Sequence, residues 1–433
     1  MEEHGVPGVA LGVLFDGEEE TAGLGVTSIE NPLEVTPDTL FQIGSIGKAF
    51  TATAVMRLVE EGKLDLDAPV RDYLPDFRLS DEAAAAGATI RHLLTHTGGW
   101  VGDYFDDFGW GDDALARMVE QVGELPQLTP LGAVWSYNNA GFYVLGRVIE
   151  VVTGRTFEAA MRELVLDPLG LEHAYYFMDD VITRRFVVGH ELDESEQTTV
   201  SRPWPIGRAA HAAGGLVTSV HELLRYARFW IDGGDLLRPE SVAEMVRPQV
   251  DVGGNIDAIG LAWMLMSIED VRLIGHGGGT KGQISWLAVA PEQKFALAVV
   301  TNHQRGGVVA DRVAEAAYEA YLGVREPEQV AIDLPRERLQ EYLGRYEARM
   351  SDLVLADTNH GLEVRLEPKA GFPTPETPPS PPPPPIPVAF SSENEIFVPE
   401  GMFKGDRAVF LRDADGRIAW LRVGGRVYAP AGR

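Results

Sequence analysis

The sequence predicts an α+β protein: an antiparallel sheet made from both ends of the first 330 residues, flanked by helices and a mostly helical subdomain, with a small all-β domain behind it. Three observations predict this fold. Strand-like apolar runs occur near residue 10 and again after residue 270, helical periodicity dominates between them, and short strand-like segments fill the end of the chain. Strands from both ends of a region can pair in one sheet, with the helices packed beside it.

The first strands should form a hairpin. Apolar runs at 8–15 and 21–27 flank Asp16-Gly17, a dipeptide typical of tight hairpin turns. From residue 45 to residue 61 the apolar residues recur at helical spacing instead, and Gly62 follows as a helix stop. The helical insertion then covers roughly residues 65–265, with further helices predicted at 81–94, 112–122, 139–153 and 156–166.

Strand character returns towards the end of this first domain. Strands are predicted at 271–275, 283–290 and 295–301, with a turn at 291–294 between the last two, and a helix at 308–322. These elements complete a domain that we place at residues 1–330.

The remaining residues predict a second domain at 336–433, an antiparallel β-barrel, after a linker at Leu334-Pro335. Short strands at such density are typical of small barrels and sandwiches. The segment Pro373 to Pro387 contains five consecutive prolines, which favour a polyproline II loop and cannot join a sheet. The predicted strands lie at 344–349, 362–366, 395–398, 408–412 and 418–423.

Composition narrows the classes of partner and site. The chain carries 65 acidic against 37 basic residues, a net charge of −28, which disfavours nucleic acid and anionic membrane surfaces. No apolar stretch reaches the length of a membrane span, so we expect no membrane partner and a cytoplasmic location, with a removed signal peptide left open. Cysteine is absent, which excludes a thiolate nucleophile and cysteine-ligated metals. The histidines lack metal-ligand spacing, so we expect neither a metal nor another cofactor.

Ser45 and Lys48 are the first candidates for chemistry. They lie three residues apart at the start of the 45–61 helix, so both side chains share one face. A serine hydroxyl becomes nucleophilic when a neighbouring base takes its proton, and the amino end of a helix favours a developing negative charge. The Ser-x-x-Lys pattern occurs once in the chain. A capping serine beside a solvated lysine is the structural alternative.

Two further motifs join this pair. Tyr137-Asn138-Asn139 precedes the 139–153 helix, and a phenol can act as a base only if a cation such as Lys48 lowers its pKa. His276 is followed by three glycines at the end of one strand, where a substrate could approach the backbone closely. The structural alternatives are a core tyrosine beside a capping asparagine, and an ordinary glycine-rich turn. Tyr104 and Trp110 lie in an aromatic, Asp-rich loop that could wall a pocket or attract an ammonium group.

Together these motifs resemble the serine β-lactamase and penicillin-binding-protein superfamily in its class C-like branch. That branch includes family VIII carboxylesterases and D-aminopeptidases. The resemblance covers residues 5–322 and follows the family's order of motifs: Phe41-Gln42-Ile43-Gly44-Ser45-Ile46-Gly47-Lys48, Leu93-Leu94-Thr95-His96-Thr97-Gly98-Gly99, Tyr137-Asn138-Asn139, Asp167-Pro168-Leu169-Gly170-Leu171, Ala213-Gly214-Gly215-Leu216 and His276-Gly277-Gly278. The last 98 residues resemble the lipocalin-like barrel of some members, including the archaeal self-compartmentalising peptidase, through Tyr342 to Glu347 and Val409 to Gly416.

The resemblance implies roles for these residues. Ser45 would be the acylated nucleophile, with Lys48 and Tyr137 sharing the general-base and general-acid work. Asn139 would orient Lys48 and the substrate. The backbone N–H groups of Ser45 and Gly279 would form the oxyanion hole, and His276 and Gly278 would stand in the substrate-binding strand.

One departure from the family's pattern affects the expected substrate. His276 stands where true β-lactamases carry the lysine of a Lys-Thr-Gly box, which binds the carboxylate of a β-lactam, and a histidine there is often neutral at pH 7. We therefore expect a serine hydrolase of small esters, amides or peptides with little β-lactamase activity. A peptidase for D-residue peptides and a non-catalytic cell-wall-peptide or penicillin-binding protein stay open as alternatives, as does a homo-oligomer.

Overall fold

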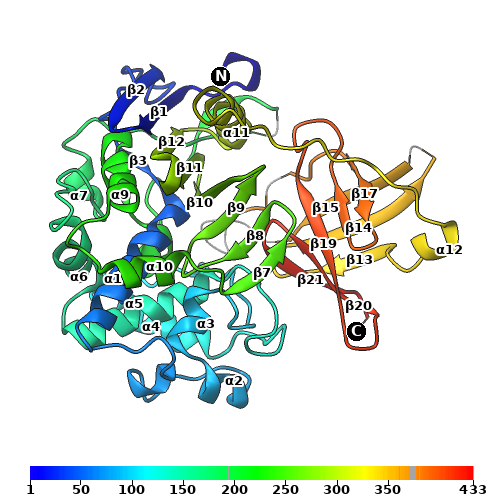
Figure 1. The fold of residues 1–433 in the computed structure, drawn as a ribbon, viewed down its shortest axis with the longest axis horizontal. Helices are drawn as coiled ribbons and strands as arrows, with labels where there is room; N and C mark the ends of the chain where they lie inside the picture. The colour runs from blue at the N-terminus through cyan, green and yellow to red at the C-terminus, as the bar shows by residue number, and fades with distance from the viewer. Residues whose placement is uncertain (194, 360, 370–376, 380, 433) are drawn as a thin grey trace.

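The computed structural model describes residues 1–193, 195–359, 361–369, 377–379 and 381–432. Figure 1 shows two parts, a larger mixed domain and a β-barrel beside it. The larger domain contains an eight-stranded antiparallel sheet in the order β2-β1-β12-β11-β10-β9-β8-β7. Its strands are β1 (Gly8–Phe15), β2 (Glu18–Gly25), β7 (Val250–Gly253), β8 (Ile256–Ile259), β9 (Met264–Ile268), β10 (Val271–Thr280), β11 (Gln283–Ala290) and β12 (Phe295–Thr301).

Both ends of this domain meet in the sheet, as the sequence predicts. β1 pairs with β12 in antiparallel register, with Val9 opposite Thr301 and Phe15 opposite Phe295. The hairpin at Asp16-Gly17 also forms, because β1 pairs along its whole length with β2. The predicted α+β arrangement is confirmed.

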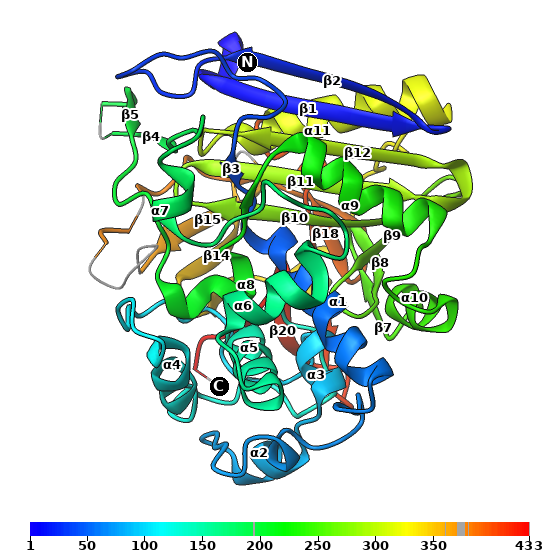
Figure 2. The same ribbon diagram turned by 90° about the vertical axis from the view of Figure 1, so that its left-hand side faces the viewer.

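Helices cover both faces of the sheet (Figure 2). Successive side chains of a strand point to opposite faces, so Val9 and Val13 pack with α11 (Gly306–Ala317). Ala10 and Leu14 pack on the other side, in the cluster that contains α9 (Val220–Asp232). Strands buried on both faces explain why this part of the sequence is so apolar.

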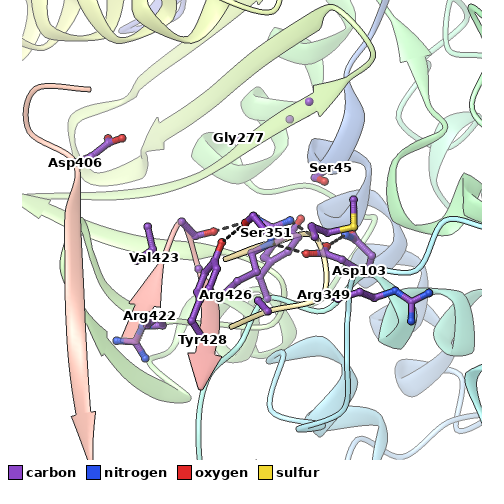
Figure 3. A pocket seen from close by; sticks show the side chains of 18 of the residues that line it. Ser45, Asp103, Gly277, Arg349, Ser351, Asp406, Arg422, Val423, Arg426 and Tyr428 are labelled. Carbon is purple, nitrogen blue, oxygen red and sulfur yellow. Dashed lines mark hydrogen bonds and ion pairs between the residues drawn. The ribbon is translucent and has the colours of Figure 1, made fainter. Parts of the chain in front are cut away.

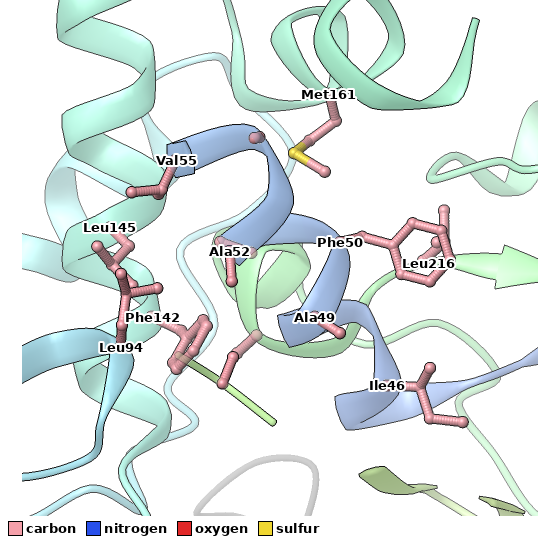
Figure 4. Close-up of a cluster of buried hydrophobic side chains, with 14 of the residues drawn as sticks. Ile46, Ala49, Phe50, Ala52, Val55, Leu94, Phe142, Leu145, Met161 and Leu216 are labelled. Atoms are coloured by element: carbon pink, nitrogen blue, oxygen red, sulfur yellow. The ribbon is translucent and has the colours of Figure 1, made fainter. Parts of the chain in front are cut away.

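Helix α1 (Gly47–Glu60) runs through the centre of the helical region and is almost entirely buried (Figure 4). Phe50 stacks on Tyr226 with ring centroids 3.8 Å apart. The other helices are α2 (Glu82–Gly87), α3 (Ile90–Leu94), α4 (Ala114–Val122), α5 (Asn139–Thr153), α6 (Phe157–Met161), α7 (Met178–Val181), α8 (His211–Gly214), α10 (Pro239–Val246) and α12 (Arg336–Leu339). Short 3-10 or π turns are η1 (Glu2–His4), η2 (Gly44–Ile46), η3 (Val70–Asp72), η4 (Arg162–Leu166), η5 (Arg208–Ala210), η6 (Pro291–Gln293) and η7 (Tyr318–Leu322).

The helix predicted at 81–94 is in fact two short helices. Ala88 and Thr89 are extended, and the Thr89 side chain caps α3 by accepting a hydrogen bond from His92 N. A threonine inside a helical pattern can therefore mark a new amino end rather than an interior position.

The second part is a nearly closed nine-stranded antiparallel barrel in the order β16-β15-β14-β13-β21-β20-β19-β18-β17. Its strands are β13 (Gly344–Glu347), β14 (Ser351–Thr358), β15 (Gly361–Pro368), β16 (Ile386–Pro387), β17 (Ala389–Ser392), β18 (Glu395–Phe397), β19 (Arg407–Arg412), β20 (Ile418–Val423) and β21 (Arg426–Pro430). Small two-stranded pairs elsewhere join β3 (Phe41–Gln42) with β6 (Val217–Thr218), and β4 (His190–Leu192) with β5 (Thr198–Val200).

The predicted barrel is confirmed, but several of its strands were not predicted. β14, β16 and β17 lie between the predicted segments, and β21 follows the last of them. The five prolines at 381–385 lie outside the sheet, as predicted, but Ile386 and Pro387 at the end of the same segment pair with β15. Proline is tolerated at a sheet edge, where its missing N–H is not needed. Residues 373–376 and 380 lie outside the described residues.

The barrel is joined to the larger domain by hydrogen bonds as well as by the chain. Tyr137 N donates to Gly425 O at 2.7 Å, and Asn255 exchanges bonds with Gly405 O and Arg407 N at 3.1 and 3.0 Å. The domain boundaries at 330 and 336 stay predictions.

We predict that Phe50→Ala lowers the free energy of unfolding by about 3–5 kcal/mol, because it removes a fully buried ring and its stack on Tyr226. Urea titration followed by tryptophan fluorescence measures the loss. Phe15, which is 37% exposed, provides the matched control, and Phe15→Ala should cost much less. Equal losses in the two variants would contradict the central place of α1 in the core.

Candidate active site

Ser45 and Lys48 come together at the start of α1. Ser45 lies in the η2 turn directly before the helix, and Lys48 follows in its first turn. Lys48 Nζ is 3.1 Å from Ser45 Oγ. Ser45 is partly exposed to the pocket, whereas the Lys48 side chain is completely buried. The Ser45 hydroxyl is therefore accessible from the pocket, whereas the Lys48 amine is shielded from water.

The surroundings of Lys48 disfavour its charged form. Lys48 Nζ donates to Ala213 O at 2.6 Å and lies 5.0 Å from the Tyr137 ring centroid. The pKa of the Lys48 amine is held well below its ordinary value, mainly because burial removes the ammonium from water and also because of the positive Arg426. A neutral amine this close to a serine hydroxyl can accept its proton.

Tyr137 lacks the lowered pKa that a phenol would need to act as a base. Its hydroxyl is buried and has no hydrogen-bond partner of good geometry among the described residues. Burial raises the pKa of Tyr137 above its usual value, although Ser45 and Arg426 act in the opposite direction. The phenol therefore keeps its proton. Its ring is held between His96, stacked at 4.4 Å, and the Arg426 guanidinium, 4.8 Å from the ring centroid.

Close backbone contacts set the candidate oxyanion hole. Gly44 has a φ of +52°, and a Cβ there would lie 2.6 Å from Gly279 N, so the turn carrying Ser45 packs directly on the strand carrying Gly279. A Cβ on Gly278 would lie 1.9 Å from Ile43 O. Glycine at these positions lets the turn with Ser45 and the strand with Gly279 approach closely, which is the contact that a shared oxyanion hole requires.

His276 lies on β10 in the pocket wall and is neutral. Burial, together with the charge of Lys48, lowers the pKa of His276 to about 3. Its Nδ1 lies 2.5 Å from Gly277 O, and Nε2 has no partner among the described residues. If Nδ1 carries the proton, Nε2 is a hydrogen-bond acceptor. Lys281, the nearby lysine of the sequence Thr280-Lys281-Gly282, instead donates to Arg202 O at 2.8 Å.

Asn139 makes a different contact from the one expected. Its Nδ2 donates to Asp103 Oδ1 at 3.0 Å, whereas Lys48 is bonded to Ser45 and Ala213 in the described part of the chain. Asp103 also pairs with Arg426, with Nε 3.2 Å from Oδ2. Arg426 belongs to the barrel strand β21 and was not predicted as a site residue. Nothing in the sequence around it signals a catalytic site, because only the docking of the barrel brings it there.

The aromatic loop supplies Phe105 and Trp110 to the pocket lining, but not Tyr104. Tyr104 is buried, and its hydroxyl donates to Asp106 Oδ2 at 2.8 Å, so the predicted role of Tyr104 as a pocket wall is corrected. The acidic side chains of this loop are largely engaged: Asp103 by Arg426, Asp106 by Tyr104, Asp112 by Arg208 and Asp113 by Arg117.

A single large pocket connects these groups with the barrel. Its volume is about 1050 Å³, and it is lined from the larger domain by Ser45, Tyr137, Asn139, His276, Gly278 and Gly279, among others. Figure 3 shows barrel residues, including Ser351, Arg426 and Tyr428, across the pocket from Ser45.

The profile of the beta-lactamase family matches residues 1–322. The chain belongs to the beta-lactamase family. This family of serine hydrolases includes amidases, β-lactamases and penicillin-binding proteins. Penicillin-binding protein 4 of Amycolatopsis lactamdurans is 35% identical over 343 residues, which cover 76% of this chain and 89% of that protein.

Solved structures extend the similarity beyond the family domain. SurE matches with a TM-score of 0.76 at 27% identity, covering 99% of this chain and 96% of its own. An octameric penicillin-binding protein homologue from Pyrococcus abyssi matches with a TM-score of 0.65 at 26% identity, covering 95% and 94%. D-amino acid amidase from Ochrobactrum anthropi SV3, solved with D-phenylalanine, matches at 0.63 and 25%, covering 74% and 96%. The first two matches include the barrel.

Two further observations concern cofactors and membranes. Among the described residues, no group of three His, Asp or Glu side chains is arranged to hold a metal ion. None of the helices in the described ranges is both long and apolar enough to cross a membrane.

We predict that Gly278→Ala slows labelling of the protein by a fluorophosphonate at least about 100-fold, because the new methyl group would push β10 away from Ile43 and separate the two N–H groups. Labelling rates measured by intact-protein mass spectrometry give the effect. Gly277→Ala is the matched control, since its Cβ would meet no atom closer than 3.5 Å. Similar rates in both variants would count against this backbone contact.

Proposed function

We propose that the protein is a serine hydrolase that cleaves esters or amides of small acyl or peptide substrates through an acyl-enzyme on Ser45, with little activity on β-lactams. The observation that carries the proposal is the buried Lys48 amine, whose pKa is held well below its ordinary value, 3.1 Å from the accessible Ser45 hydroxyl. A serine activated in this way is a nucleophile rather than a structural cap.

The chemistry follows from the proton positions. Lys48 takes the proton of Ser45 as Oγ bonds to the substrate carbonyl carbon, and the N–H groups of Ser45 and Gly279 hold the resulting oxyanion. Tyr137, which keeps its own proton, gives that proton to the leaving alcohol or amine and regains one from Lys48. Water then releases the acyl group by the same steps in reverse, which restores Ser45.

His276 supports the expectation of weak β-lactam turnover. A neutral imidazole supplies no positive charge for the carboxylate of a β-lactam, and burial keeps this imidazole neutral throughout the working pH range. An acceptor nitrogen suits a substrate that offers an N–H or O–H group instead.

D-residue peptides are the second candidate substrate class. SurE has been solved with D-Leu, and D-amino acid amidase with D-phenylalanine. The pocket, at about 1050 Å³, has room for a peptide of several residues rather than a small ester alone. Penicillin-binding protein 4 keeps the third candidate open, a protein that is acylated without turnover.

We predict that short p-nitrophenyl esters are hydrolysed and that Ser45→Ala removes this activity, because the covalent step needs the hydroxyl. The panel should include D- and L-aminoacyl anilides and a chromogenic cephalosporin, each followed by absorbance. A preference for D- over L-anilides would favour the D-residue peptidase. Rapid cephalosporin turnover would contradict the interpretation that a neutral His276 disfavours β-lactam substrates.

Mass spectrometry of the intact protein separates an enzyme from a binder. Transient acylation that disappears as product accumulates supports the hydrolase. A stable adduct on Ser45 supports the penicillin-binding alternative, and the absence of any adduct or product with every substrate contradicts both.

We predict that Arg426→Met moves the acid limb of the kcat/KM profile to higher pH. Arg426 repels the Lys48 ammonium, so losing its charge raises the pKa of Lys48 and leaves less neutral amine at a given pH. Asp103, left without its partner, acts in the same direction. Arg426→Lys keeps the charge and should leave the limb near its original position. An unmoved limb in Arg426→Met would mean that Arg426 does not influence the base.

A further inference from the structure

We propose that the interior of the C-terminal barrel is a substrate subsite that takes an uncharged, elongated apolar chain attached to the scissile ester or amide. The inference rests on the proposed function and adds a substrate class to it. The shared chemistry is a run of aliphatic carbon, whether from a fatty acyl or alkyl group or from the apolar side chains of a peptide.

The cavity that begins at Ser45 continues into the barrel. Residues of the barrel line it, among them Phe397, Asp406 and Arg407. The aliphatic side chains of the barrel in this lining include Leu353, Val364, Leu366, Ile386, Val388, Ile396, Val398, Ala408 and Leu421. Seven of these come from six strands, and Val388 and Val398 lie next to β17 and β18, so the aliphatic lining surrounds the cavity rather than forming one wall.

Four aromatic rings of the barrel lie outside this lining. The Tyr342 ring packs edge to face on Phe390 and Phe410, 4.9 and 4.8 Å away. Tyr346 joins them, 6.1 Å from Phe410, and Arg412 donates to Tyr342 Oη at 2.8 Å. None of these four rings lines the cavity, although they belong to the same buried cluster as the lining residues Leu353 and Leu421. The aromatic rings therefore pack behind the aliphatic lining.

Polar side chains of the barrel also line the cavity: Arg349, Ser351 and Arg426, drawn on the side of Asp103 in Figure 3, and Arg422, which is drawn beside Tyr428. Arg422 also donates to Val252 O of the larger domain. A cavity with both kinds of lining fits a substrate whose reacting group is polar and whose tail is apolar, because burying a charge among aliphatic side chains is strongly unfavourable.

The size of the expected effect follows from apolar burial. Each buried methylene contributes about 0.8 kcal/mol, close to a fourfold change in an equilibrium constant. We therefore expect kcat/KM to rise at least about tenfold from a butanoate to a decanoate ester if the chain enters the barrel.

The test uses two ester series on the full chain. One series varies the acyl chain, from p-nitrophenyl acetate to p-nitrophenyl decanoate, and the other varies the alcohol, from ethyl to octyl acetate. A rise with chain length in either series supports the subsite and shows which side of the scissile bond enters it. Hydrolysis that is equal for all lengths in both series overturns the subsite but leaves the proposed function standing. Loss of all Ser45-dependent hydrolysis would instead contradict the proposed function.

Adjacent positions on β15 provide a matched pair of variants. Val364 lines the cavity, and Arg365 is exposed on the outer face. Val364→Phe fills the interior and should remove the gain for the long chain while leaving acetate hydrolysis within about twofold, whereas Arg365→Phe should leave the chain-length profile unchanged. Equal profiles in the two variants would overturn the subsite.

Direct binding keeps the test independent of catalysis and of variant stability. The probe is N-phenyl-1-naphthylamine, a neutral apolar fluorophore, added to the Ser45→Ala protein. Saturable fluorescence that decanol or a hydrophobic hexapeptide amide displaces supports the subsite, and the better competitor separates the alkyl from the peptide source. No saturable binding would contradict it.

Discussion

The burial of the Lys48 amine is the constraint on which the rest of the site depends. Its side chain has no exposed surface, and no carboxylate pairs with it among the described residues. An unpaired ammonium in such surroundings costs several kcal/mol, which holds the pKa of the Lys48 amine well below its ordinary value. Water is excluded from the Lys48 amine by α1 at the centre of the core, by the Phe142 ring 5.4 Å from Nζ, and by Tyr137. The reactivity proposed for Ser45 is thus a consequence of packing.

The second requirement is close approach of backbones. In the proposed mechanism Lys48 activates Ser45 from the same helix, whereas the oxyanion needs a second N–H donor from a segment far away in the sequence. The antiparallel sheet places β10 against η2, and glycine at 44 and 278 removes the side chains that would hold them apart. Because one added carbon at 278 would overlap Ile43 O, the spacing between the two donors is fixed by the backbone rather than by a flexible side chain.

What could be predicted from the sequence was local or followed a known order of motifs. The Ser45–Lys48 pair follows from helical spacing, and the β1 hairpin from Asp16-Gly17. The barrel strand β14 was missed because its apolar residues Leu353, Val354, Leu355 and Ala356 are consecutive, so the alternation typical of a strand with one exposed face is absent.

The sequence left the protonation state of Tyr137 open, since it shows a nearby cation but not the depth of burial that raises the pKa of the phenol. Arg426 could not be found at all. Its position depends on how two domains dock, and such docking leaves no local pattern in the sequence.

The docking itself shows why the barrel is part of the site rather than an attachment. Gly424 and Gly425 form the turn between β20 and β21, both with positive φ, as a tight two-residue hairpin turn requires. A Cβ on Gly425 would lie 2.8 Å from Trp135 and 3.3 Å from Tyr137, so this turn presses directly on the segment that carries the phenol.

Gly425 O accepts a hydrogen bond from Tyr137 N. The next residue, Arg426, places its guanidinium over the Tyr137 ring. Moving the barrel away would leave a backbone donor without its partner, at a cost of about 1–3 kcal/mol if it stayed buried. The same movement would remove the charge that helps to keep Lys48 neutral. The position of the barrel and the protonation of the candidate base are therefore coupled through three consecutive features: the turn, the carbonyl and the guanidinium.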